Sequence, residues 1–199
     1  MTSSPNVARD AIGRPAALAG IVARMRNGVR AGESGLITLA VVVGILAGLT
    51  TTALSRMAAG LHLLLFGHAA LSSLERLDSP WLALVPACGG LLLGAGSRVL
   101  LRRRRGRPID AIEANALAGG RMSLIDSGVI GVQTLASNGF GASVGLEAGY
   151  TQLGAGLASA LGRFFNLRRA DLRMMVGAGA AGAIAAAFGA PLTLSLIHI

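Results

Sequence analysis

Long uncharged stretches alternate with short charged ones along the chain. Leu36 to Leu54 contains no charged residue and is rich in Val, Leu and Ile, and after Arg56 the uncharged pattern resumes from Met57 to Leu74. About 20 consecutive apolar residues are enough for a helix to cross a bilayer, and no turn signal separates the two halves. We therefore predict one long tilted helix whose far end leaves the hydrocarbon. Two separate crossings are the alternative.

A second apolar run extends from Trp81 to Ser97, after a short acidic turn with Glu75 and Asp78. Trp81 stands where an interfacial aromatic anchor is expected. The run ends at the densest charge cluster of the chain, which consists of Arg98, Arg102, Arg103, Arg104, Arg105 and Arg107. Basic segments outside the two runs and an acidic loop between them fit a hairpin that begins and ends in the cytoplasm. A patch for lipid headgroups or nucleic acid is the alternative to this topological role of the arginines.

Beyond Pro108 the apolar segments become shorter and glycine recurs inside them. The glycines are Gly119, Gly120, Gly128, Gly131, Gly139, Gly141, Gly145, Gly149, Gly154, Gly156 and Gly162. Small residues spaced by four let membrane helices pack closely, as for the pairs Gly44/Gly48, Gly90/Gly94 and Gly141/Gly145. Glycines also interrupt helices at transporter sites. The sequence leaves both interpretations open.

Composition places the chain in the membrane. Of its 199 residues, 53% are hydrophobic and another 29 are glycine, whereas apolar residues and glycine together make up about 45–50% of a soluble domain. This excludes a soluble globular domain, a disordered tail and a disulfide-stabilised secreted module. The net charge of +9 comes with only 4% aromatic residues, so stacking platforms for nucleic acid are missing. We predict an all-α, multi-pass protein of the cell membrane that binds no nucleic acid.

Two further expectations concern the N-terminal segment and enzymatic chemistry. Residues 1–35 are polar and basic, which predicts a cytoplasmic segment; Ala16 to Val29 forms either a short surface helix or a solvated tail. His62 and His68 are isolated, and we interpret them as interfacial residues rather than metal ligands. Because the apolar spans hold no pair of His, Cys, Asp or Glu with acid–base or ligand spacing, we expect no enzyme activity, metal or cofactor.

The most informative charge in the apolar part of the chain is Glu147. It is the only charged residue between Asp126 and Arg163. A carboxylate at bilayer depth costs roughly 2.5 kcal/mol or more on insertion scales, and such a residue is a functional-site hypothesis by default. Something in the fold must therefore offset its cost.

Glycines around Glu147 suggest how the charge is stabilised. Gly141 and Gly145 permit an irregular loop before the apolar run that extends from Ala148 to Gly162, so we predict that Glu147 begins a helix. Unpaired N–H groups and the positive end of the helix dipole stabilise an anion there. A site that holds a carboxylate can hold a small inorganic anion in its place. The alternative is a capping residue that faces water.

Two motifs resemble the CLC family of chloride channels and proton/chloride antiporters. The gating motif G-R-E-G-P, often preceded by G-x-S-x, is similar to G-A-S-V-G-L-E-A-G at residues 141–149. The segment A-A-G-x-A-A-A-F-x-A-P-L of the family is similar to residues 180–192, which read A-A-G-A-I-A-A-A-F-G-A-P-L. The two motifs have the family's usual separation.

The resemblance implies an all-helical fold with inverted repeats and broken helices at the ion site, and a homodimer in which each subunit has its own pore. It implies transport of chloride by a channel or a proton-coupled antiporter, gated by Glu147. The backbone around the outer anion site would consist of Gly145, Leu146, Glu147, Ala148 and Gly149. A non-transporting membrane scaffold or an inactive fragment is the alternative function.

The sequence departs from the family at three places. Leu146 replaces the basic residue of the gating motif, and Ala148 and Gly149 replace its Gly-Pro. Arg107 stands where the family has the serine of G-S-G-I-P, and we interpret it as part of the inside-positive cluster rather than as a chloride-attracting group. After Thr193 the resemblance ends, and residues 194–199, L-S-L-I-H-I, read like translated sequencing adapter. We therefore expect residues 36–193 to be a truncated first repeat, followed by a non-native tail.

Overall fold

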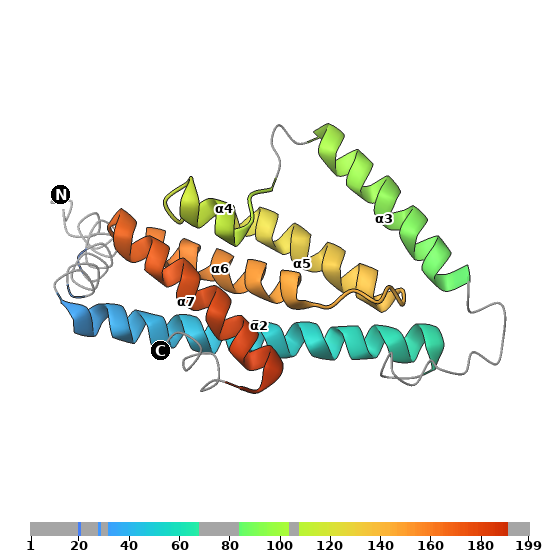
Figure 1. Ribbon diagram of the computed structural model, residues 1–199, viewed down its shortest axis with the longest axis horizontal. Helices are drawn as coiled ribbons and strands as arrows, with labels where there is room; N and C mark the ends of the chain where they lie inside the picture. Colours follow the sequence, from blue (N-terminus) through green and yellow to red (C-terminus); the bar gives the residue numbers. More distant parts are fainter. Residues whose placement is uncertain (1–19, 21–27, 29–31, 68–83, 104–107, 191–199) are drawn as a thin grey trace, which may run out of the picture.

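The computed structural model describes residues 32–67, 84–103 and 108–190, together with Gly20 and Gly28. This part of the chain is helical and contains no strand (Figure 1). The helices are α2 (Glu33–Phe66), α3 (Leu84–Arg103), α4 (Ala111–Ala116), α5 (Leu124–Gly139), α6 (Glu147–Phe164) and α7 (Arg169–Phe188). The all-α class is thus confirmed for these residues. Several predictions concern residues outside this part of the chain. They are the surface helix around Ala16–Val29, of which only Gly20 and Gly28 are described, the acidic turn, and the tail after Thr193. His68, Trp81 and Arg104 to Arg107 also lie outside it.

Helix α2 is a single helix of 34 residues that continues through Arg56, so the prediction of one long helix is confirmed. It ends at Phe66 rather than at Leu74, because Gly67 adopts a left-handed conformation with φ of 73° and donates its N–H to the Leu63 carbonyl. One stripe of α2 faces the protein and is buried: Leu39, Val43, Ala47, Thr51, Leu54, Ala58, His62 and Phe66. Large apolar side chains such as Ile45 and Leu64 are exposed on its other sides.

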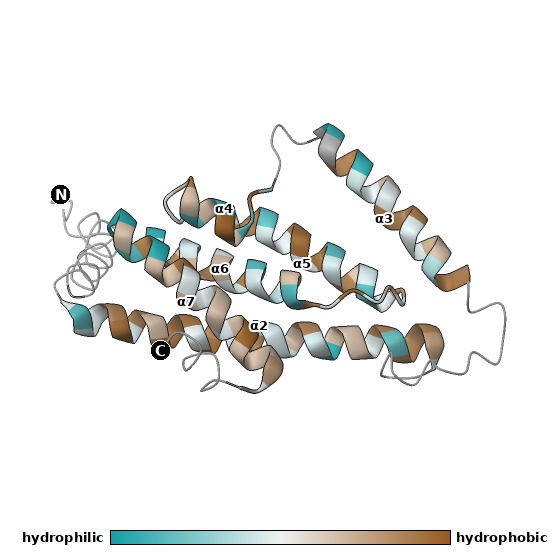
Figure 2. Ribbon diagram, viewed as in Figure 1, coloured by the Kyte–Doolittle hydropathy of each residue, from teal (hydrophilic) through white to brown (hydrophobic). Residues whose placement is uncertain are grey.

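Two helices of the described residues, α2 and α7, have the length and hydropathy to cross a membrane by themselves. Figure 2 shows how apolar residues cover most of α2. In α3 the apolar stretch, Leu84–Leu100, is shorter, and the helix runs past the predicted end at Ser97 to Arg103. Arg98 and Arg102 on this extension are exposed.

Helix α6 lies at the centre of the bundle and packs against α7, α2 and α5. Its backbone touches that of α7 where Gly154 faces Gly179, since a Cβ on either glycine would overlap the other's carbonyl oxygen. Small residues bring α2 and α7 together as well: Gly48 faces Ala186, and Gly44 faces Gly182. The pair therefore lies at the α2–α7 contact, but a Cβ on Gly44 would meet no atom within 4 Å and one on Gly48 would lie 3.8 Å from Ala186, so the close approach that we predicted does not require these glycines.

The other two glycine pairs do not pack helices in the described part of the chain. Gly141 and Gly145 lie outside the helices, in the segment between α5 and α6. At Gly90 and Gly94 on α3 no atom lies within 4 Å of where a Cβ would stand. The packing interpretation is wrong for Gly141 and Gly145, because these glycines form the loop that separates two helices.

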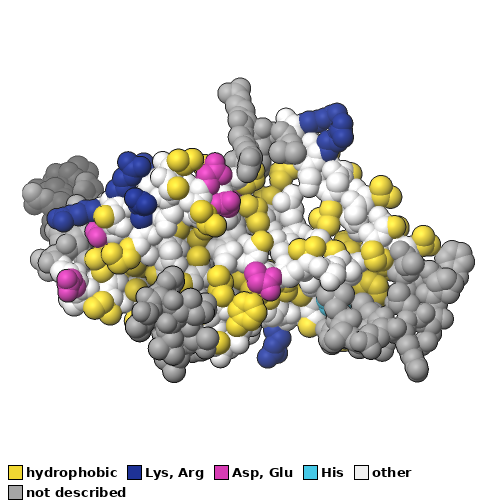
Figure 3. Space-filling view, in the orientation of Figure 1, with side chains coloured by type: hydrophobic (Ala, Val, Ile, Leu, Met, Phe, Trp, Pro, Cys, Tyr) yellow, Lys and Arg dark blue, Asp and Glu magenta, His cyan; other side chains and the backbone are white. Residues whose placement is uncertain are grey.

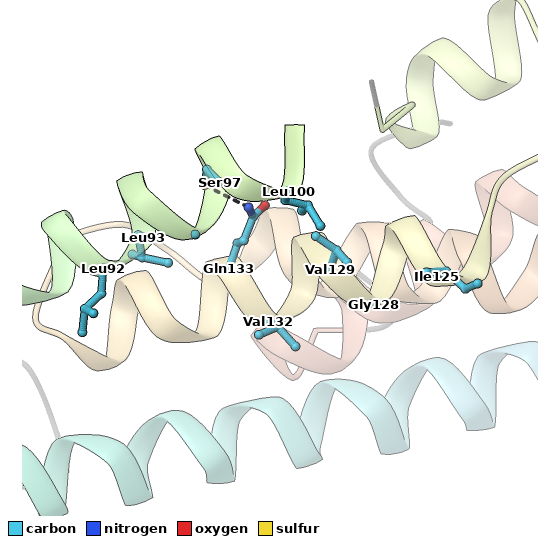
Figure 4. Close-up of a pocket in the computed structure, with 10 residues that line it drawn as sticks. Leu92, Leu93, Ser97, Leu100, Ile125, Gly128, Val129, Val132 and Gln133 are labelled. Atoms are coloured by element: carbon cyan, nitrogen blue, oxygen red, sulfur yellow. Dashed lines mark hydrogen bonds between the residues drawn. The ribbon is translucent and has the colours of Figure 1, made fainter. Parts of the chain in front are cut away.

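Helix α3 is attached to the bundle along α5, with the two helices antiparallel (Figure 1). Gly89 lies against the ring of Phe140, and Gln133 donates a hydrogen bond of 3.1 Å to the Ser97 hydroxyl. An open cavity of about 470 Å³ separates the helices, lined by Leu92, Leu93, Ile125, Val129 and Val132 around the Gln133–Ser97 pair (Figure 4). The α3–α5 interface is thus loosely packed.

Candidate functional site

Glu147 is the first residue of α6, after Leu146 in the N-cap position, whose side chain forms no capping hydrogen bond. The first hydrogen bond of this turn joins the Tyr150 N–H to the Leu146 carbonyl oxygen, at 2.9 Å. The preceding N–H groups of Glu147, Ala148 and Gly149 have no carbonyl partner within the helix, as at every helix start. The prediction that Glu147 begins a helix is confirmed.

The Glu147 carboxylate lies against the backbone of Gly145. Its two oxygens occupy the space that a Cβ on Gly145 would need. The side chain is nevertheless exposed, so its end is free to rotate away without movement of α6. The positive end of the helix dipole favours a negative charge at this place.

The loop before Glu147 begins with a sharp reversal at the end of α5. Gly141 has φ of 86°, a conformation that residues with a Cβ rarely adopt. A Cβ there would also approach the Phe66 ring to 2.9 Å. The N–H of Gly141 binds the Asn138 carbonyl at 2.9 Å, and the N–H of Ala142 binds the Ser137 carbonyl at 3.1 Å. Of the two roles considered for these glycines, close packing and helix breaking, Gly141 has the second, because the reversal there ends α5.

A buried pair of side chains holds this loop to α2. His62 Nε2 lies 2.7 Å from the carbonyl oxygen of Asn138, and because a carbonyl only accepts, Nε2 is the donor. Asn138 Nδ2 donates to the Val144 carbonyl at 2.9 Å. His62 is 4% exposed and Asn138 is 8% exposed. His62 is thus a buried link between α2 and the last turn of α5, from which the Asn138 side chain reaches the loop; its depth in the membrane stays a prediction.

The first turn of α6 is fixed on its inner side. The hydroxyl groups of Tyr150 and Ser55 form a hydrogen bond of 2.6 Å between α6 and α2. Gly149 fits between α2 and α5, since a Cβ there would lie 3.2 Å from atoms of both Leu54 and Thr134. The inner side of the turn is therefore rigidly seated, whereas Glu147 and Ala148 are exposed.

The residues of the expected anion site lie together in this loop and turn. Gly145, Leu146, Glu147, Ala148 and Gly149 are consecutive and provide N–H groups at one helix end. Arg107 is outside the described residues, and the start of α4 next to it is capped by Asp110, whose Oδ1 accepts the Glu113 N–H at 2.7 Å. Among the described residues no three His, Cys, Asp or Glu side chains are grouped for a metal ion.

Comparisons with known proteins agree on one family. The profile of the family described as voltage gated chloride channel matches residues 89–197. A ClcB-like chloride channel protein of Ralstonia nicotianae is 39% identical over 123 residues, which are 57% of this chain and 28% of that protein. A chloride/fluoride channel protein of Pseudomonas syringae pv. tomato is 30% identical over 162 residues, or 71% of this chain and 33% of that protein. The chain spans about a third of the length of these curated relatives. No solved structure matches it.

Proposed function

Because the chain belongs to the voltage gated chloride channel family, we propose that it is part of a protein that moves chloride across the cell membrane under the control of Glu147. The observation that supports this role is the position of the Glu147 carboxylate. It lies against Gly145 at the start of α6, where unpaired N–H groups attract a negative charge.

The proposed mechanism is an exchange of one anion for another. With the carboxylate against Gly145, the place at the start of α6 is taken. When the exposed side chain rotates outward or gains a proton, the N–H groups of Gly145 to Gly149 become available to chloride. No large movement is needed, because Tyr150 and Gly149 hold the turn in place on α2 and α5.

The departures from the family motif affect the strength of this site. Leu146 packs against the buried cluster that contains Leu54 and Tyr150, where the family motif has a basic residue. The attraction for chloride would then depend on the helix end alone, worth typically 0.3–1 kcal/mol per charge at exposed positions. We propose that this site binds chloride weakly, as suits a fast transport step.

The assembly and topology are part of the same proposal. The helix start at Glu147, with its exposed carboxylate, supports an ion site at a helix end of the kind found in transporters, whereas the reversal between α5 and α6 joins two helices and is not an interruption within one. We propose that residues 36–193 belong to the first of two inverted repeats, that two complete chains form a homodimer, and that the N-terminus is cytoplasmic. The short span relative to the two relatives is consistent with a second repeat elsewhere in the complete protein.

Chloride flux from liposomes that contain the complete protein tests the proposal. We expect Glu147→Gln and Glu147→Ala to change the flux several-fold and, if transport is coupled to protons, to abolish the effect of a pH gradient. Glu33→Gln is the matched control, because Glu33 is another exposed carboxylate in the first turn of a helix. Fluoride is measured in parallel, since one relative is named for both anions. Unchanged flux in both Glu147 variants would favour the scaffold alternative.

A further inference from the structure

Positive charge accumulates at the start of α7. Arg168, Arg169 and Arg173 are all exposed, and Asp171 is the acidic residue of the first turn. Arg169 and Arg173 are four residues apart and share one face of the helix, an arrangement of like charges that costs a few tenths of a kcal/mol. The helix dipole disfavours cations at this end as well. An anion beside these arginines would relieve both costs.

The turn after α4 brings a further arginine to the same place. The side chain of Arg169 lies across Gly119, and the backbone at Leu172 and Arg173 lies against Gly120. Both glycines have positive φ, 62° and 81°, which allows this close approach. Arg121 follows directly and is exposed. Figure 3 shows dark-blue side chains gathered at this end of the molecule, beside apolar ones.

An apolar cavity adjoins the arginines. It has a volume of about 330 Å³, lies between α4 and α7, and is lined by Ile112, Asn115, Arg173, Val176 and Ala180. Beside it Ile112 is 82% exposed and Leu117 is 75% exposed. Asn115 Oδ1 is the one buried side-chain oxygen or nitrogen of the described residues that lacks a hydrogen-bond partner. Such groups are rare in native proteins and call for an explanation.

We propose that this surface of α4 and α7 binds an anionic glycerophospholipid. The phosphate would lie between Arg169 and Arg173, because guanidinium groups match phosphate oxygens in charge and geometry. The acyl chain would cover Ile112 and enter the cavity along Val176 and Ala180. A hydroxyl of a glycerol headgroup could donate to Asn115 once its amide turns toward the cavity.

Charge and polarity together select this ligand over simpler ones. A free phosphate would neutralise the arginines but leave Ile112 and Leu117 uncovered. A zwitterionic lipid would cover the apolar residues but adds an ammonium group next to Arg169 and Arg173. An anionic lipid both neutralises the arginines and covers the apolar residues. A protein embedded in a bilayer meets such lipids at high local concentration. The inference does not depend on the role of Glu147.

Native mass spectrometry of the complete protein, with phosphatidylglycerol or phosphatidylcholine of identical acyl chains, tests the proposal. We expect at least fivefold preferential retention of phosphatidylglycerol, lost in the double variant Arg169→Gln/Arg173→Gln. Arg56→Gln is the control, since Arg56 is exposed on α2 and should leave retention unchanged. Ile112→Gln removes an exposed apolar side chain with little risk to folding, and we expect it to lower retention about threefold.

Three outcomes would overturn the proposal. Equal retention of the two lipids would exclude headgroup selection. Displacement of phosphatidylglycerol by millimolar inorganic phosphate, with no effect of Ile112→Gln, would leave a phosphate site only. Preference that survives the double arginine variant, with helix content unchanged by circular dichroism, would place the lipid elsewhere.

Discussion

Gly145 is the residue whose lack of a side chain permits the resting position of Glu147. A Cβ at this position would overlap the carboxylate oxygens. We therefore expect Gly145→Ala to displace the carboxylate and to change chloride flux in the same direction as Glu147→Ala. The free energy of unfolding should fall by less than about 1 kcal/mol, because the displaced group is the end of a flexible side chain.

The matched control for Gly145→Ala is Gly60→Ala, where no atom lies within 4 Å of the added methyl group. Flux of both variants is measured in the liposome assay used for Glu147. If Gly145→Ala left the flux and its pH dependence unaltered, the carboxylate position against Gly145 would have no part in transport.

His62 fixes the loop through a buried hydrogen bond. In His62→Phe the ring is retained but the donor to the Asn138 carbonyl is lost. The Asn138 carbonyl still accepts the Gly141 N–H at 2.9 Å, so the variant loses one hydrogen bond, worth about 0.5–1.5 kcal/mol, and we expect a modestly lower thermal unfolding temperature in detergent. Because the loop leads to Glu147, anion selectivity should also change, whereas a purely structural residue would alter stability alone. Thr52→Val is a control, since Thr52 bonds only within its own helix, to Gly48.

At the scale of single residues the sequence predicts the helix start at Glu147, which α6 confirms, but not the residues that hold the loop before it. Glu147 stands out because glycines precede it and an uncharged run follows it. His62 and Asn138 are separated by 76 positions, and although His62 continues the buried stripe of α2, large apolar residues on the other sides of this helix hide the stripe in the sequence. Their contact depends on how α2 and α5 pack, which one sequence does not reveal.

Among the described helix contacts, the α6–α7 crossing has the least room for an added side chain. Gly154 and Gly179 face each other with their backbones in contact. We expect Gly154→Ala to destabilise the protein by about 1–3 kcal/mol, because overpacking forces the backbones apart. Gly94→Ala on α3, where the space is open, should be neutral or stabilise by up to about 1 kcal/mol. Thermal unfolding in one detergent compares the two, and equal effects would contradict this account of the crossing.

The helices were predictable where neighbouring residues in the sequence mark their extent. The uncharged pattern around Arg56 predicts one helix, and α2 has no break there. Its end at Phe66 was missed, because Gly67 lies within a stretch that remains apolar to Leu74. For Gly154 and the other glycines of α6 close packing was one of two open interpretations, and the partner of Gly154 is set by the crossing of the two helices and not by spacing.

At the scale of the molecule, α3 is the least firmly attached of the helices in the described part of the chain. Gln133 and Ser97 form a polar contact in the middle of the α3–α5 interface. Interhelical hydrogen bonds in membrane proteins contribute about 0.6 kcal/mol on average, so we expect Gln133→Leu to loosen α3 without unfolding the bundle. Cys88, the single cysteine of this chain, is exposed on α3 and accepts a fluorescent or spin label there.

The mobility of that label is the readout for Gln133→Leu, with any cysteines elsewhere in the complete protein replaced. We expect faster motion than in the unsubstituted protein. Thr134→Val is the control on α5, because the Thr134 hydroxyl bonds within its own helix, to the Ile130 carbonyl. An immobile label in Gln133→Leu would show that other contacts hold α3.

The length of α2 has a consequence for how the membrane voltage acts. Its 34 residues extend about 51 Å, whereas a hydrocarbon core of about 30 Å takes up about 39 Å of helix even at a steep tilt of 40°. Part of α2 therefore stands in the headgroups or in water. Glu33 and Arg56 flank one uncharged run, and the start of α6 packs beside Leu54, two residues before Arg56. We infer that the hydrocarbon ends near Arg56, which brings Glu147 nearer to the membrane surface than the bilayer depth considered from the sequence. We expect the Glu147 carboxylate to cross only a small fraction of the transmembrane electric field when it moves, so that its own charge contributes little to voltage sensitivity.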